Sequence, residues 1–323
     1  MTEAGVERGG EAGEPRHVAL LLPGRGSQFV GMGRDLAEAF PSVRELYERA
    51  DDLLAVPLSA ISWKGPEETL TGTENAQPAI LVHSYGAWTV LAERLGGTVS
   101  VAAGHSLGEF TAHLIAGTFG FEDALRVVRR RGELMARAGE RRPGTMSAVI
   151  GLEDREVEAA CAAVERGVVV PANFNAPGQV VISGEVDAVA RAGELAAERG
   201  ARRVVPLNVS GAFHSPLMSE SRDGLRDALR AVELSDPGFP VVANARAEPV
   251  TDASGARETL VEQLTSPVRW AAGVRRMAEM GPDRWLELGP GRVLAGLLRR
   301  IDRDLEVMSV GDVAGVRAVL AGA

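Results

Sequence analysis

From residue 17 onward, short apolar runs alternate with longer amphipathic stretches. Residues 17–24 are apolar until a proline and a glycine end the run, which predicts a buried strand. Residues 75–97 predict a helix closed by two glycines. Residues 99–104 predict another short strand, and residues 106–117 predict a second helix. Strands that alternate with helices in this way are typical of an open, mainly parallel sheet.

The pattern changes between residues 141 and 209. The expected elements there are a strand at 145–152, a helix at 153–166, strands at 167–175 and 179–184, a helix at 185–200 and a strand at 201–209. This β-α-β-β-α-β order is that of a split βαβ, or ferredoxin-like, unit. Strands at 239–245 and 284–291 and an amphipathic helix at 292–301 follow.

These elements predict an α/β protein with two domains. A large α/β-hydrolase-like domain with a mainly parallel sheet would comprise residues 17–140 and 210–323. A small ferredoxin-like domain, residues 141–209, would be inserted into it. Residues 1–16 are polar and rich in glycine, so they predict a disordered leader.

Composition narrows the possible partners and the compartment. The net charge of −9 argues against nucleic acid as a partner, because a phosphate-binding face needs an excess of lysine and arginine. No apolar run approaches the roughly 20 residues of a membrane-spanning helix, so we expect no membrane partner. Cys161 is the only cysteine and cannot form an internal disulfide. A reducing cytoplasm is therefore the expected location.

Residues 104–108, GHSLG, fit the G-x-S-x-G pattern of a nucleophile elbow. The glycines allow a sharp turn, and the strand before and helix after are the context that this pattern requires. Ser106 would be the nucleophile, and the free amide of Leu107 at the helix start would be one oxyanion donor. The alternative is a tight strand-to-helix turn without chemistry.

A serine hydroxyl needs a general base, and the chain has five histidines. His17 is expected at the surface and His83 inside a helix. His105 should diverge from Ser106, and His113 would lie about two helical turns, roughly 10 Å, away. His214 follows a predicted strand and precedes a proline, and we favour it as the base, although periodicity alone does not bring it to Ser106.

Eight stretches resemble, in order, those of malonyl-CoA:acyl-carrier-protein transacylases, the acyltransferases of fatty-acid and polyketide synthesis. They are LLPGRGSQFVGMGRDL, AQPAI, GHSLGEF, RRRGELM, NFNAPGQVVISG, GAFHSPLM, QLTSPVRW and ELGPGRVLAGLLRRI. The resemblance covers residues 17–303 and also implies the inserted ferredoxin-like domain. It implies that Ser106 takes the acyl group as an ester and that His214 removes its proton and later activates the carrier thiol.

The resemblance also implies roles for further residues. The backbone carbonyl of Gln263 would orient His214, and the backbone amide of Arg25 would be the second oxyanion donor. Asn175 matches an active-site asparagine. Arg131 matches the arginine that pairs with the free carboxylate of malonyl, which suits a planar guanidinium that can donate two parallel hydrogen bonds.

Two positions bear on which acyl group is accepted. Phe213 directly precedes His214, and in related polyketide enzymes a phenylalanine there accompanies malonyl rather than methylmalonyl. The family usually has glutamine where this chain has Arg25. A backbone donor would survive that change, but a second cation near the pocket mouth puts the identity of the acyl group in question.

The sequence therefore predicts an acyltransferase that moves malonyl from malonyl-CoA to the phosphopantetheine thiol of an acyl carrier protein. We expect a monomer with no metal and no cofactor, since coenzyme A arrives as part of the substrate. The glycine patterns of dinucleotide and nucleotide sites are incomplete. The alternatives are a starter-unit or other extender-unit transferase, an editing acyl-thioester hydrolase, and a non-catalytic partner-binding module.

Overall fold

The structure is a computed structural model that describes residues 17–322, so the predicted leader lies outside the described residues. Its larger sheet has the strand order β10 (Val307–Val310), β9 (Arg284–Leu288), β1 (Val18–Leu22), β2 (Val99–Gly104), β7 (Val241–Val242) and β8 (Pro249–Val250). All neighbours run parallel except β7 and β8. The prediction of an α/β fold with a mainly parallel sheet is confirmed.

Alternate residues of β1 face opposite sides of this sheet, as the two-residue period of a strand requires. Val18, Leu20 and Leu22 belong to the main core, whereas Ala19 and Leu21 belong to a second cluster on the other face. The helices that cover the main core include α2 (Pro41–Leu54), α5 (Thr73–Leu95), α6 (Leu107–Ile115), α7 (Phe121–Arg141) and α14 (Val313–Leu320). The helices α12 (Trp270–Glu279) and α13 (Val293–Ile301) cover the second face. Burial on both faces explains why β1 reads as a continuous apolar run.

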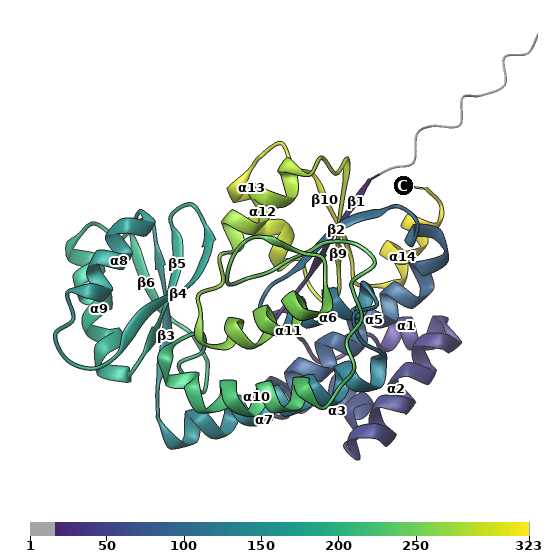
Figure 1. The fold of residues 1–323 in the computed structure, drawn as a ribbon, viewed down its shortest axis with the longest axis horizontal. Helices are drawn as coiled ribbons and strands as arrows, with labels where there is room; N and C mark the ends of the chain where they lie inside the picture. The colour runs from purple at the N-terminus through teal and green to yellow at the C-terminus, as the bar shows by residue number, and fades with distance from the viewer. Residues whose placement is uncertain (1–16, 323) are drawn as a thin grey trace, which may run out of the picture.

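A second sheet is antiparallel throughout and lies to one side of the first (Figure 1). Its strand order is β4 (Val169–Ala176), β5 (Gln179–Gly184), β3 (Thr145–Ile150) and β6 (Arg203–Pro206). The helices α8 (Asp154–Ala162) and α9 (Val186–Glu198) pack on its outer face through a separate apolar cluster that includes Cys161. The chain order of these elements is the predicted β-α-β-β-α-β.

The two sheets are joined through the backbone. Val268, just before α12, donates to the carbonyl of Ala172, and its own carbonyl accepts from Phe174. A segment of the larger body therefore pairs with the edge strand β4.

The remaining elements complete the larger body. They are α1 (Arg34–Ala39), α3 (Leu58–Lys64), α4 (Glu67–Thr71), α10 (Ser219–Arg230), α11 (Ala253–Glu262) and the short 3₁₀ turns η1 (Pro216–Met218) and η2 (Gln263–Thr265). No helix among residues 17–322 has the length and apolarity needed to cross a bilayer.

Several predicted boundaries differ from the structure by a few residues. The helix expected from residue 75 begins at Thr73, and Pro78 lies in its first two turns. The strand expected at 239–245 forms ladder bonds only over Val241–Val242, because the chain then leaves the sheet at Asn244.

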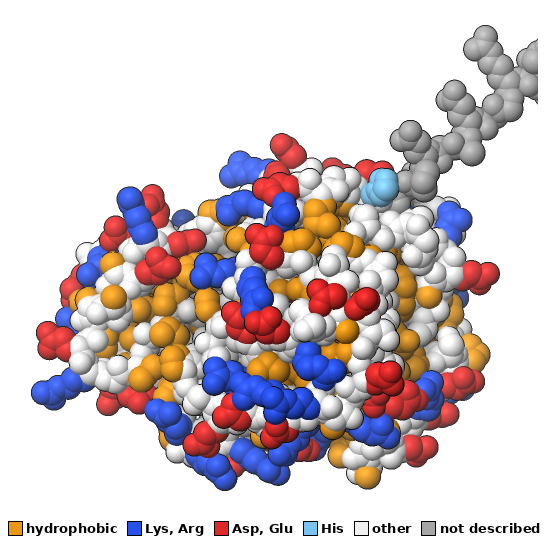
Figure 2. Space-filling model, in the orientation of Figure 1, with side chains coloured by type: hydrophobic (Ala, Val, Ile, Leu, Met, Phe, Trp, Pro, Cys, Tyr) orange, Lys and Arg blue, Asp and Glu red, His pale blue; other side chains and the backbone are white. Residues whose placement is uncertain are grey.

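Charges of both signs are interspersed over the visible face in Figure 2. Basic side chains gather below its centre, over the region that Figure 1 assigns to α10 and α11. A groove there is lined by five arginines and two glutamates, with Arg246 paired to both glutamates: Arg222, Arg226, Arg230, Arg246, Arg257, Glu258 and Glu262.

Candidate active site

Ser106 lies at a sharp turn between β2 and α6, with φ 52° and ψ −103°. Gly104 and Gly108 allow the strand and helix to come this close. A Cβ on Gly104 would lie 1.8 Å from the carbonyl carbon of Gly108, and one on Gly108 would lie 2.0 Å from the carbonyl oxygen of Leu22. The GHSLG stretch therefore folds as the strained elbow that its glycines predict.

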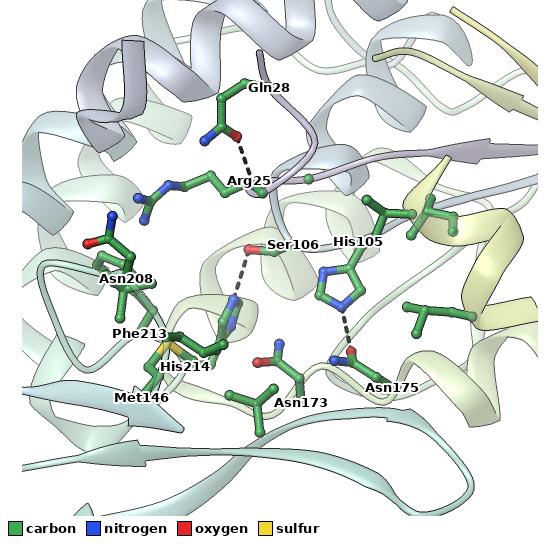
Figure 3. A pocket seen from close by; sticks show the side chains of 18 of the residues that line it. Arg25, Gln28, His105, Ser106, Met146, Asn173, Asn175, Asn208, Phe213 and His214 are labelled. Atoms are coloured by element: carbon green, nitrogen blue, oxygen red, sulfur yellow. Dashed lines mark hydrogen bonds between the residues drawn. The ribbon is translucent and has the colours of Figure 1, made fainter. Parts of the chain in front are cut away.

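His214 reaches this serine from a distant loop (Figure 3). Its Nε2 lies 2.8 Å from Ser106 Oγ, and its Nδ1 lies 2.9 Å from the carbonyl oxygen of Gln263. Since a carbonyl only accepts, Nδ1 carries the proton and Nε2 is free to accept the serine proton. Burial, reinforced by the charge of Arg131, lowers the pKa of His214 to about 3. The imidazole is therefore a neutral base at physiological pH.

Arg131 lies behind the serine and is fully buried. Its Nη2 donates to Ser106 Oγ at 3.0 Å and to Gln263 Oε1 at 2.8 Å, and its Nη1 donates to Gln77 Oε1. Burial lowers the pKa of Arg131 to about 9, against the opposing attraction of Glu109. The guanidinium remains charged at neutral pH and within reach of any group attached to the serine.

Sequence reasoning missed three residues that hold this arrangement. Glu109 is fully buried, and its Oε2 accepts a hydrogen bond from Gln263 Nε2 at 2.7 Å and one from the backbone N–H of Asn244 at 3.0 Å. The Asn244 side chain accepts from the amide of Ser106 at 2.7 Å. Gln77 is the third, through its bond to Arg131. The only sequence signal was a glutamate inside an otherwise apolar helix, which a buried partner explains.

Burial raises the pKa of Glu109 to about 7, although the bonds from Gln263 and Asn244 and the charge of Arg131 act in the opposite direction. Gln263 thus has four hydrogen-bond partners: its backbone carbonyl accepts from His214, its side-chain oxygen accepts from Arg131, and its side-chain nitrogen donates to Glu109 and to the carbonyl of Ser106. The sequence predicted the first of these contacts and not the others.

Ser106 and His214 line a cavity of about 370 Å³ between the two sheets. Phe213, Arg25 and Asn175 line the same cavity, and the Arg25 guanidinium lies 5.0 Å from the centre of the Phe213 ring. Apolar side chains from α13, the second sheet and the segment after β6 complete the walls: Met146, Val181, Leu207, Val209, Val293, Leu294 and Leu297.

Asn175 contacts the elbow by a hydrogen bond to the side chain of His105. Its Oδ1 lies 2.8 Å from Nε2 of His105, so His105 diverges from Ser106, as expected, yet belongs to the same cavity (Figure 3).

The two expected oxyanion donors, Leu107 and Arg25, belong to α6 and to the loop after β1. Leu107 is the first residue of α6, where a backbone N–H has no partner within the helix. Arg25 follows Gly24, at which a Cβ would lie 2.2 Å from the carbonyl oxygen of His105. The loop after β1 therefore runs directly against the elbow.

The other histidines lie apart from this cavity. His113 is buried with Nδ1 3.0 Å from the hydroxyl of Thr118, and His83 is buried with Nε2 2.9 Å from the carbonyl oxygen of Gly311. His17 is exposed at the start of β1.

A serine on an elbow, a neutral histidine beside it and an arginine behind it define an enzyme of acyl transfer. The chain belongs to the family described as "Acyl transferase domain", whose model matches residues 20–317. It is 41% identical over 297 residues to the malonyl CoA-acyl carrier protein transacylase of Bacillus subtilis, covering 91% of this chain and 93% of that protein. It is 43% identical over 306 residues to the Haemophilus influenzae transacylase of the same name, covering 94% and 98%.

Solved structures give the same result. One is a type II PKS acyl-carrier protein in complex with its malonyl-transacylase. The match has 42% sequence identity and a TM-score of 0.92, and it covers 95% of this chain and 100% of that chain. Another is an acyl carrier protein S-malonyltransferase from Vibrio cholerae. This match has 44% sequence identity and a TM-score of 0.89, and it covers 94% of this chain and 99% of that chain.

Proposed function

We propose that this acyltransferase moves a malonyl group from malonyl-CoA to the phosphopantetheine thiol of an acyl carrier protein. The observation that carries the proposal is the placement of Arg131, whose Nη2 lies 3.0 Å from Ser106 Oγ. A carboxylate close to the attached carbonyl would pair with this buried cation, whereas an acetyl group would give the cation no anionic partner. The names of the relatives support the same substrate and acceptor.

In the proposed first step, Ser106 Oγ attacks the thioester carbonyl and His214 Nε2 takes the hydroxyl proton. The backbone amides of Arg25 and Leu107 would stabilise the oxyanion. The C–S bond then breaks, and His214 returns the proton to the sulfur of coenzyme A. In the second step the carrier thiol attacks the seryl ester and gives its proton to His214. The ester bond then breaks, and His214 passes this proton to Ser106 Oγ.

The remaining site residues have proposed supporting functions. The Gln263 carbonyl keeps His214 in the tautomer that leaves Nε2 free. Asn175 fixes His105 on the cavity wall. Phe213 fills the space beside the acyl group and would disfavour an α-methyl substituent, by about 1–3 kcal/mol. No resident cofactor takes part in the proposed cycle.

We further propose that residues 141–209 form a ferredoxin-like domain inserted into an α/β-hydrolase-like domain made of 17–140 and 210–323. The order of the β3–β6 segment supports the first description, and the elbow between β2 and α6 supports the second. A monomeric state and a cytoplasmic location stay predictions.

Intact-mass measurement after mixing with malonyl-CoA tests the function. We expect a single malonyl adduct in the wild type and none in Ser106→Ala, followed by transfer to added carrier protein. Arg131→Ala should lower malonyl use at least about tenfold more than acetyl use, because only malonyl loses a charged hydrogen bond.

Three outcomes would contradict the proposal. An adduct in Ser106→Ala would move the nucleophile elsewhere. Release of free malonate with no loading of the carrier would indicate the editing hydrolase, and equal losses of malonyl and acetyl in Arg131→Ala would remove the carboxylate contact.

A further inference from the structure

A guanidinium other than that of Arg131 lies in the cavity. Arg25 lines the cavity, and in Figure 3 its side chain extends past Ser106 toward the side that holds Asn208 and Phe213. Its Nη2 donates to the carbonyl of Thr71 at 3.3 Å, and its Nε is buried without a hydrogen-bond partner among residues 17–322. A cation with unused donors in a partly dry cavity is costly unless it has an anionic ligand.

The protein itself supplies little neutralisation. Glu74 is the carboxylate whose charge acts on Arg25, yet no ion pair joins the two among the described residues. The Arg25 guanidinium makes a cation–π contact with the face of the Phe213 ring, which accepts no hydrogen bond from its N–H groups. Burial lowers the pKa of Arg25 to about 10, so it stays charged at neutral pH.

The two arginines differ in how far they lie from the reacting atoms. Arg131 does not line the cavity, and its Nη2 uses its two hydrogens on Ser106 and Gln263. A carboxylate held by Arg131 must therefore fold back against the serine, which suits a short acyl chain. The Arg25 guanidinium lies beside Phe213 in the cavity lining, beyond the serine in Figure 3, where the end of a longer acyl chain would lie.

The position also limits the kind of anion. The phosphates of a coenzyme A thioester are separated from the carbonyl by the whole pantetheine arm, whereas Arg25 lies in the loop that contacts the elbow. Within the acyl part, the anion available to this arginine is a terminal carboxylate.

We propose that Arg25 forms a second carboxylate-binding position, which admits dicarboxylic acyl groups longer than malonyl, such as succinyl. This inference rests on the proposed function and extends its substrate class. The chemistry is unchanged: Ser106 Oγ forms the ester, the C–S bond of succinyl-CoA breaks, and the serine proton passes through His214 to the departing thiol.

The test compares matched pairs of thioesters in single-turnover acylation, followed by intact mass. Succinyl-CoA is paired with butyryl-CoA and malonyl-CoA with propionyl-CoA, because each pair differs by exchange of a carboxylate for a methyl group. We expect the wild type to prefer succinyl over butyryl by at least about tenfold.

Arg25→Gln should reduce the succinyl-to-butyryl ratio to near one while changing the malonyl-to-propionyl ratio less than about twofold. Glutamine is the residue that the family usually has here, so the variant is compatible with the fold. Arg25→Lys keeps the charge and should retain part of the succinyl preference.

The possible failures are distinguishable. A wild type that takes malonyl but does not prefer succinyl over butyryl would overturn only this inference. Equal loss of both ratios in Arg25→Gln would also overturn it, because Arg25 would then act on every carboxylate. A wild type that prefers succinyl over butyryl but forms no malonyl ester would support the inference and overturn the proposed function.

Discussion

At the scale of single residues, the site is built on strained backbone. Ser106 and His214 both have positive φ, at 52° and 57°, and only two other non-glycine residues among those described share this feature. Such conformations cost about 1–3 kcal/mol each and persist only where the surroundings hold them. The glycines of the elbow made the strain at Ser106 predictable, whereas nothing near His214 in the sequence indicated it.

The low pKa of His214 leads to a prediction for the pH profile. A base must be neutral to act, and a pKa of about 3 keeps it neutral far below pH 6.5. We expect the single-turnover rate of malonyl acylation to change less than about twofold between pH 8 and 5.5, where an ordinary histidine would lose about tenfold. Rapid-quench measurement of the acyl-enzyme gives this rate.

Glu109 is the control in this experiment, because its pKa of about 7 lies within the range tested. A tenfold fall near pH 6.5 that persists in Glu109→Gln would assign the titration to His214 and contradict the prediction.

At the scale of elements, several site residues lie at the ends of helices and strands rather than within them. Ser106 precedes α6, Asn244 follows the two-residue strand β7, and Gln263 begins η2. Apolar periodicity predicted the strands and helices because it reports burial. It could not predict that β7 stops early so that Asn244 can bond to the Ser106 amide, since that depends on a contact 138 residues away.

Glu109, in the first turn of α6, should hold Asn244 and Gln263 in place, because its Oε2 accepts a hydrogen bond from each of them. Glu109→Ala leaves two buried donors unpaired, on Asn244 and Gln263, and should lower the free energy of unfolding by at least about 2 kcal/mol. It should also slow malonyl acylation at least about tenfold. Urea denaturation and single-turnover kinetics measure the two effects.

Glu109→Gln retains an acceptor oxygen and should stay within a few-fold of wild-type acylation. If Gln and Ala reduced the rate equally, the hydrogen-bond explanation would be wrong and charge would be responsible.

At the scale of the whole molecule, the sequence predicted the chain order of the second sheet and four strands of the larger one, β1, β2, β7 and β9, but not its edge strands β8 and β10. A resemblance extending over most of the chain implied five of the residues that line the cavity: Arg25, Ser106, Asn175, Phe213 and His214. The sequence did not predict how the sheets are joined, because neither the Val268 segment nor the edge of β4 carries a pattern that indicates pairing between the two. The buried histidines away from the cavity also affect the molecule as a whole, through its stability.

His113 is fully buried, and burial lowers its pKa to about 3. Below pH 6.5 the unfolded chain binds a proton there and the folded chain does not, so stability is lost as the pH falls below 6.5. Between pH 7 and pH 5, the unfolding free energy of His113→Gln minus that of wild type should shift by about 2 kcal/mol in favour of the variant. Urea denaturation at both pH values measures this difference.

His17→Gln, at the surface, is the matched control for removing a histidine. Parallel pH dependences for wild type and His113→Gln would show that this site does not contribute to acid sensitivity.

The backbone bonds between Val268 and β4 have a consequence for protein engineering. Anyone exchanging the proposed small domain between relatives, to alter which acyl groups are accepted, would ordinarily cut near residues 141 and 209. Those cuts would leave the recipient's own Val268 region facing a foreign strand edge. A chimera that carries the donor's residues 266–270 along with residues 141–209 would preserve the bonds between Val268 and β4 and the geometry of the pocket beside them.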